Sequence, residues 1–199
     1  MKAIETVYRG YKFRSRLEAR WAVFFSVLGL DFEYEKEGYD LEWYTQAGGF
    51  YYLPDFWVPA WNAFVEIKGQ EPAEDELEKC QVLRDSHYGK KGKKVIMFTG
   101  DPMTQKGIWF QCTLGKKGFF NNDAPICNTR EIELRQCSNC DTMWACSRGS
   151  EVDRFMLKSG ERCPEKDGSD CWQSSWAVTD KLLNAMTMAR QERFQGGME

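Results

Sequence analysis

The clearest pattern of apolar and polar positions lies near the start of the chain. Between residues 17 and 28, large apolar side chains recur mostly at intervals of three and four residues, which places them on one face of an α-helix. Ser15 is a predicted N-cap, and Glu18 three residues later completes a capping-box pattern. Gly29 marks the expected end of the helix. The apolar stripe consists of Leu17, Trp21, Phe24, Phe25 and Leu28.

Two strands joined by a tight connection are expected further along the chain. Residues 51–58 and 63–68 are rich in aromatic and β-branched side chains, and only four residues separate them. This separation is short enough for a β-hairpin. Shorter extended segments are expected at 6–13, 32–34 and 39–41.

A second helix and a buried strand complete this pattern. The helix is expected from Pro72 to about Asp85, and the apolar run at 94–99 is typical of a buried strand that ends at Gly100. An order of helix, strands, helix and strand is that of a mixed α/β sandwich. The sequence therefore predicts the α/β fold class with a mixed sheet.

The character of the sequence changes after Gly100. Glycine, asparagine and cysteine become frequent and the periodicity fades, until residues 174–194 regain helical spacing. We therefore expect a core at 1–110, a cysteine-rich region at 111–173, and a C-terminal helix within 174–199 that packs on the core. A length of 199 residues suits one domain, or one domain with a smaller appendix.

Composition narrows the expected cellular location and partners of the protein. Hydrophobic residues make up 42% of the chain, enough for a core, yet no run approaches the ~18 apolar residues that span a bilayer. The first five residues lack the apolar stretch of a signal peptide. We therefore expect a cytoplasmic protein without a membrane partner. A net charge of −3 argues against a broad basic surface for nucleic acid but leaves room for a local one.

Pro54-Asp55 and Glu66-Ile67-Lys68 carry the main chemical signal. Side chains alternate along a strand, so Glu66 and Lys68 share one face. A fully buried strand has no structural need of a glutamate and a lysine on the same face. If this strand pairs with the one that bears Asp55, two carboxylates and an ammonium group meet there.

These charges are costly to bury unless something compensates them. A Mg²⁺ ion would do so, because it binds few carboxylates together with waters and substrate phosphate oxygens. Such an ion acidifies a bound water, and Lys68 would position that water or help to deprotonate it. Glu18 lies at the margin of the apolar stripe of the first helix and adds a third carboxylate. It is either a metal ligand or only a helix cap.

Three segments of the chain resemble PD-(D/E)XK nucleases common in phage genomes: Tyr11–Ala22, Tyr52–Phe56 and Val65–Gly69. The resemblance covers roughly residues 6–100 and implies a restriction-endonuclease-like fold. In that superfamily the first helix supplies a glutamate, the hairpin an aspartate, and the E-x-K strand a glutamate and a lysine. The matching residues here are Glu18, Asp55, Glu66 and Lys68.

The resemblance implies that Glu18, Asp55 and Glu66 bind Mg²⁺ or Mn²⁺ during hydrolysis of DNA, with a 5′-phosphate left on the product. We expect an endonuclease that acts in the host cytoplasm if it is phage-encoded. A structure-selective nuclease such as a junction resolvase is one alternative. Another is a DNA-binding zinc module on a nuclease fold that no longer cuts. Cleavage of a duplex by one active site per chain would favour a homodimer.

Two features narrow the class of nuclease. Some members of the superfamily carry a Gln-x-x-x-Tyr motif after the catalytic strand, but here Gln81 is followed at that spacing by Asp85. The exonuclease branches with that motif therefore fit less well. His87 is the only histidine, which argues against histidine-dependent nucleases of the HNH type.

Seven of the eight cysteines follow Gly100. Cys137 and Cys140 have the two-residue spacing of a zinc knuckle, and Cys163 with Cys171 is the best candidate for the second pair. Cys146 is the rival ligand. In a reducing compartment, cysteines clustered among few aliphatic residues favour a structural Zn²⁺ site over buried thiols. A site of four cysteines leaves no open position for catalysis.

Overall fold

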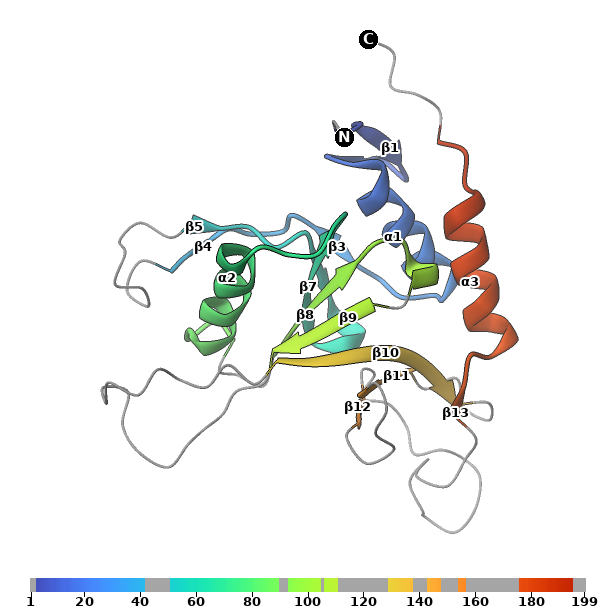
Figure 1. The fold of residues 1–199 in the computed structure, drawn as a ribbon. Coiled ribbons are helices and arrows are strands. Elements are labelled where there is room, and N and C mark those ends of the chain that lie inside the picture. Colours follow the sequence, from blue (N-terminus) through green and yellow to red (C-terminus); the bar gives the residue numbers. More distant parts are fainter. Residues whose placement is uncertain are drawn as a thin grey trace.

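The structure is a computed structural model, and it describes residues 3–41, 51–89, 93–104, 106–110, 129–137, 143–147, 154–156 and 176–194. Within these residues, three α-helices pack on the two faces of one mixed β-sheet, and two small sheets lie beside it (Figure 1). The expected mixed α/β architecture is confirmed. No helix in this part of the chain is both long enough and apolar enough to cross a membrane.

The main sheet contains nine of the strands in the described residues, and neighbouring strands follow the order β12-β11-β10-β9-β8-β7-β6-β3, with β13 beside β10. All its pairs are antiparallel except β7 with β8, because helix α2 crosses over between these two strands. The strands are β3 (Glu33–Tyr34), β6 (Phe56–Val58), β7 (Ala63–Lys68), β8 (Lys94–Thr99), β9 (Lys106–Phe110), β10 (Thr129–Cys137), β11 (Met143–Ser147), β12 (Arg154–Met156) and β13 (Trp176–Ala177).

The two small sheets have two strands each. Strands β1 (Thr6–Tyr8) and β2 (Tyr11–Phe13) form an antiparallel hairpin within the segment 6–13 that was expected to be extended. Its two connecting residues, Arg9 and Gly10, both have positive φ angles, as tight hairpin turns require. Strand β4 (Tyr39–Asp40) pairs with β5 (Tyr51–Tyr52).

Helices α1 (Arg16–Val27) and α3 (Asp180–Gln191) cover one face of the sheet. The Ser15 side chain accepts a hydrogen bond from the Glu18 backbone N–H, which confirms the predicted N-cap of α1. Trp21 of α1 stacks on Phe98 of β8 with 4.4 Å between ring centroids. Helix α3 contributes four buried side chains to the same core, namely Leu182, Ala185, Met186 and Ala189.

Helix α2 (Glu74–Asp85) covers the opposite face. Strand β7 shows how the faces divide, because Val65 and Ile67 belong to the core under α1 whereas Phe64 belongs to the core under α2. Alternation therefore places Glu66 and Lys68 on the α2 face. Both side chains contact residues of that face, as described below.

One expectation about the strands needs correction. The single strand expected at 51–58 is divided, since β5 and β6 belong to different sheets and Pro54 between them has no N–H to continue a ladder. Strand β10 lies in the cysteine-rich region, for which the sequence specified no element, and it pairs with β9 and extends the main sheet. Its buried residues, Ile132, Leu134 and Gln136, alternate along the chain as in any half-buried strand.

Candidate active site

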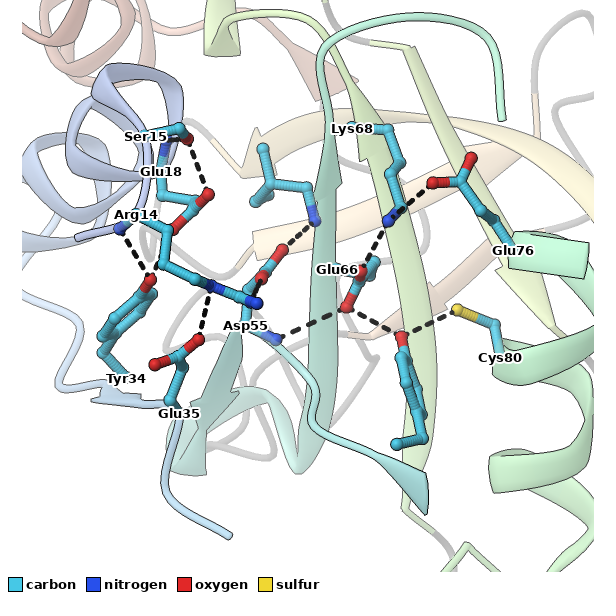
Figure 2. A network of polar contacts seen from close by, with 12 residues as sticks. Arg14, Ser15, Glu18, Tyr34, Glu35, Asp55, Glu66, Lys68, Glu76 and Cys80 are labelled. Carbon is cyan, nitrogen blue, oxygen red and sulfur yellow. Dashed lines mark hydrogen bonds and ion pairs between the residues drawn. The ribbon is translucent and has the colours of Figure 1, made fainter. Parts of the chain in front are cut away.

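The side chains singled out in the sequence meet where the start of α1, the start of β6, the end of β7 and the first turns of α2 come together (Figure 2). Glu18, Asp55 and Glu66 are buried, with 8%, 3% and 6% of their surfaces exposed. Lys68 is partly buried between two carboxylates. Three buried carboxylates in one region are unusual in a globular protein, where such groups are rarely buried without a partner.

Asp55 is held by one backbone and one side-chain donor. Its Oδ2 accepts the N–H of Ile67 on β7 at 2.7 Å, and its Oδ1 accepts Arg14 Nη2 at 2.9 Å. Burial raises the pKa of Asp55 well above its ordinary value, and the charges of Glu66 and Glu18 raise it further. The Ile67 hydrogen bond and Arg14 oppose this shift without cancelling it. Asp55 is therefore a buried carboxylate with too little positive charge around it.

Glu66 and Lys68 form an ion pair on β7. Glu66 Oε1 lies 2.9 Å from Lys68 Nζ, and Glu66 Oε2 accepts the hydroxyl of Tyr52 at 2.7 Å. Lys68 Nζ also lies 2.9 Å from Oε1 of Glu76 on α2. Burial alone would lower the pKa of Lys68, but the two glutamates outweigh it and raise that pKa. Lys68 is therefore held as an ammonium ion.

Glu18 occupies the capping-box position that the sequence predicted, and its carboxylate makes two further hydrogen bonds. Its backbone N–H bonds the N-cap Ser15, and its Oε1 accepts the Ser15 hydroxyl at 2.6 Å. Its Oε2 accepts the hydroxyl of Tyr34, whose pKa is raised by burial and by this hydrogen bond. The carboxylate thus turns toward β3 and acts on the pKa of Asp55, instead of serving only the helix backbone.

Among the described residues, Arg14 is the charged residue that forms an ion pair with Asp55. Its Nε lies 2.6 Å from Glu35 Oε1, so the guanidinium bridges two carboxylates. The side chain is 57% exposed, in contrast to the buried Asp55. Burial by itself lowers the pKa of Arg14, but Tyr34, Asp55 and Glu35 raise it, so the charge is permanent.

Several residues of this network were not foreseen from the sequence. Arg14 and Tyr52 lie inside the segments that carry the nuclease resemblance, but nothing in their spacing indicates their partners. Arg14 contacts a residue 41 positions away, and Tyr52 one that is 14 positions away. Only the tertiary fold brings them together. The unforeseen residues are Arg14, Tyr34, Glu35, Tyr52, Glu76 and Cys80.

The donor set suits a hard divalent cation. In the part of the chain that the structure describes, no three His, Cys, Asp or Glu side chains already converge on a point that would hold a metal ion. Mg²⁺ does not need three, since one or two carboxylates with waters and substrate phosphates are its usual ligands in enzymes. Asp55 and Glu66 offer oxygen atoms only. Burial and the charges of Glu66 and Glu18 raise the pKa of Asp55, and a bound cation would favour its charged form.

The cysteines predicted to bind zinc fall largely outside the described residues. Cys140, Cys163 and Cys171 lie outside them. For Cys137 on β10, and for Cys146 on β11, the rival to the second pair, only the backbone is described. Cys80, by contrast, is a buried free thiol on α2.

Comparison with known proteins adds no assignment. No protein-family model matches the sequence, and no curated protein is significantly similar to it.

Proposed function

We propose that this chain is a metal-dependent nuclease that hydrolyses phosphodiester bonds of DNA as an endonuclease. The observation that supports the proposal most is the buried Asp55, whose backbone N–H lies 3.4 Å from Oε2 of Glu66, the carboxylate that pairs with the Lys68 ammonium. We further propose that residues 1–110 form a restriction-endonuclease-like core. The parallel pair β7 and β8, linked through α2, and the antiparallel hairpin of β6 and β7 are compatible with such a core.

Asp55 and Glu66 are the proposed direct ligands of Mg²⁺ or Mn²⁺, and Glu18 acts on the cation directly or through a bound water. When bound, the cation lowers the pKa of a coordinated water and neutralises charge on the scissile phosphate. The chain's own contribution is to hold the carboxylates in place. The Ile67 N–H orients Asp55, and the Tyr52 hydroxyl orients Glu66.

Lys68 supplies a fixed positive charge. An ammonium group has three N–H donors, and its described bonds to Glu66 and Glu76 use two of them. The third is left for the attacking water or for a phosphate oxygen. A donor that is fixed before the reaction stabilises developing negative charge without further reorganisation.

DNA is the proposed substrate, and Arg14 is suited to contact it. Its half-exposed guanidinium lies beside Asp55, where a phosphate bound to the cation would also lie. Arginine recognises phosphate through paired N–H donors. Cleavage of both strands of a duplex by one such site per chain would favour two chains acting together, so we include a homodimer in the proposal.

Zinc and a cytoplasmic location complete the proposal. Thiolates of Cys137 and Cys140, with two of Cys146, Cys163 and Cys171, would hold one structural Zn²⁺, which requires a reducing compartment. Elemental analysis should then find about one zinc per chain, as expected for a four-thiolate site. Metal-free protein in which residues 121–171 resist protease as well as they do in untreated protein would contradict this assignment, as would disulfides.

The nuclease proposal is tested by incubating the purified protein with supercoiled, linear and single-stranded DNA in Mg²⁺, Mn²⁺ or EDTA. We expect nicked or linear product from supercoiled DNA with either cation, 5′-phosphate ends, and no product in EDTA. Asp55→Ala should be inactive under all these conditions. Cleavage that persists in EDTA, or a wild-type protein that cuts none of the DNAs, would overturn the proposal.

A further inference from the structure

Helix α2 reaches the Glu66–Lys68 pair at two points one helical turn apart. Glu76 and Cys80 are four residues apart, so both lie on the same side of the helix. Glu76 contacts Lys68 directly, and Cys80 contacts the hydroxyl of Tyr52, which in turn donates to Glu66 (Figure 2). Helix α2 therefore contacts Lys68 directly through Glu76, and it contacts Glu66 indirectly through Cys80 and Tyr52.

Glu76 is fixed at both carboxylate oxygens. Its Oε1 lies 2.9 Å from Lys68 Nζ, and its Oε2 accepts the N–H of Ala73 at the start of α2, also at 2.9 Å. Burial alone would raise the pKa of Glu76, but the bonds to Lys68 and Ala73 outweigh it and lower that pKa. A lysine side chain loses rotamer entropy when it is ordered. Glu76 imposes this order before any substrate arrives.

Tyr52 fixes the other member of the pair. Its hydroxyl donates to Glu66 Oε2 at 2.7 Å and lies 3.3 Å from Cys80 Sγ. The tyrosine is 7% exposed and Cys80 is fully buried, so this contact is shielded from water. The hydroxyl bonds one oxygen of the Glu66 carboxylate and Lys68 bonds the other, so together they set the orientation of this carboxylate.

We propose that Glu76 and Tyr52 are positioning residues, with Glu76 holding the Lys68 ammonium and Tyr52 holding the Glu66 carboxylate. This inference rests on the proposed function and adds residues to which the nuclease resemblance assigns no role. It has a physical reason. A cation on Glu66 weakens the attraction between Glu66 and Lys68, so Lys68 needs a second anchor that does not bind the cation. Glu76, on a different element, provides it.

The two residues should affect different quantities. Loss of Glu76 frees Lys68 but leaves Asp55 and Glu66 in place, so the turnover number should fall while cation affinity is kept. Loss of the Tyr52 hydroxyl leaves Glu66 Oε2 with the longer bond from the Asp55 N–H, at 3.4 Å, so cation affinity should fall first. Partners of this kind typically change affinity or activity by about 10- to 100-fold.

The test compares Glu76→Gln and Glu76→Ala with Glu74→Gln, and Tyr52→Phe with Tyr51→Phe. Glu74 is an exposed carboxylate on the same helical turn, and Tyr51 is an exposed tyrosine on the same strand, so each control makes a similar chemical change away from the site. Mn²⁺ binding without DNA is measured by electron paramagnetic resonance, and kcat is measured at saturating Mn²⁺. Glu76→Gln can still accept the Ala73 N–H, which keeps the start of α2 intact.

We expect Glu76→Gln and Glu76→Ala to lower kcat about tenfold or more with Mn²⁺ affinity within about twofold of wild type. Tyr52→Phe should weaken Mn²⁺ binding about tenfold, with most of kcat recovered at saturating Mn²⁺. Both controls should behave as wild type. If Glu76→Gln and Tyr52→Phe lower only the melting temperature, the positioning role is wrong although the nuclease assignment stands. If wild type itself neither cuts nor binds Mn²⁺, the proposed function fails instead.

Discussion

The two ends of the candidate site are built differently. On the α1 side, Asp55 is buried, and its described bonds come from one backbone N–H and from Arg14, a guanidinium more than half exposed to solvent. On the α2 side, Glu66 and Lys68 are joined to each other, and Tyr52 and Glu76 complete the network. At one end a half-exposed guanidinium faces the buried carboxylate, while at the other an ammonium group is fixed between two carboxylates.

This difference suggests a division of labour. A buried carboxylate with a raised pKa gains most from a cation, because the cation removes the cost of its charge. An ammonium between two carboxylates gains nothing from a further cation, but it is already oriented for a substrate oxygen. We therefore expect cation binding to depend on Asp55 and Glu66, which supply the ligand oxygens, and the turnover number mainly on Lys68.

The largest effects should come from removing one charge at each end. Lys68→Ala and Asp55→Ala should each reduce cleavage to below about one hundredth of the wild-type rate, since both remove electrostatic stabilisation of the reacting phosphate. Gel assays of plasmid cleavage measure this. Only Asp55→Ala should also abolish Mn²⁺ binding. Asp55→Ala leaves the Ile67 N–H without its acceptor, at a cost of about 1–3 kcal/mol, which circular dichroism melts would detect.

Glu71→Ala is the matched control for both variants, because it removes an exposed carboxylate whose partner is Lys106. It should cut at the wild-type rate. A Lys68→Ala protein with wild-type activity would remove the proposed role of the ammonium.

A smaller effect is expected at Glu18. Glu18→Gln keeps a group that can bond both Ser15 and Tyr34, so its melting temperature should stay near that of wild type. The Mn²⁺ concentration needed for half-maximal cleavage should rise about tenfold. Ser15→Ala should do the reverse, with a stability loss of about 1 kcal/mol from the lost N-cap and a smaller change in activity.

Paired thermal melts and metal titrations of these two variants separate the two roles of Glu18. Should Glu18→Gln lose stability alone, with its metal dependence unchanged, Glu18 is a helix cap and nothing more.

The smallest effect concerns the exposed partner of Asp55. In the metal-free protein Arg14→Gln removes positive charge from Asp55, so Mn²⁺ should raise the melting temperature more in this variant than in wild type. The difference should correspond to at most about 1 kcal/mol, as for other half-exposed ion pairs. Differential scanning fluorimetry with and without Mn²⁺ measures it. Lys12→Gln, which disrupts an exposed pair with Glu5, is the control. An identical Mn²⁺ shift in Arg14→Gln and wild type would place the cation away from Asp55.

The parts of this site that depend on local sequence could be predicted. The Ser15 cap and the apolar face of α1 follow from helical spacing, and the shared face of Glu66 and Lys68 follows from strand alternation. Strand β10 carried the same kind of signal, since Ile132 and Leu134 are spaced two apart, but the surrounding cysteines and glycines obscured it.

The supporting residues could not be predicted, for a physical reason. The Tyr34–Glu18 bond joins β3 to α1, and the Tyr52–Cys80 contact joins β5 to α2. Such contacts depend on how the helices pack against the sheet. The spacing of apolar residues in a single sequence does not indicate this packing. A tyrosine in a strand also occurs commonly in an ordinary apolar core, so its presence does not indicate a functional site.

The most direct measurement is isothermal titration calorimetry of Mn²⁺ into metal-stripped protein without DNA, for wild type, Asp55→Ala and Glu71→Ala. If Asp55 and Glu66 share a cation, wild type and Glu71→Ala should show the same saturable binding step. In Asp55→Ala this step should weaken by at least about tenfold. The same binding curve for wild type and Asp55→Ala would contradict a cation site at Asp55, and with it the metal-dependent mechanism.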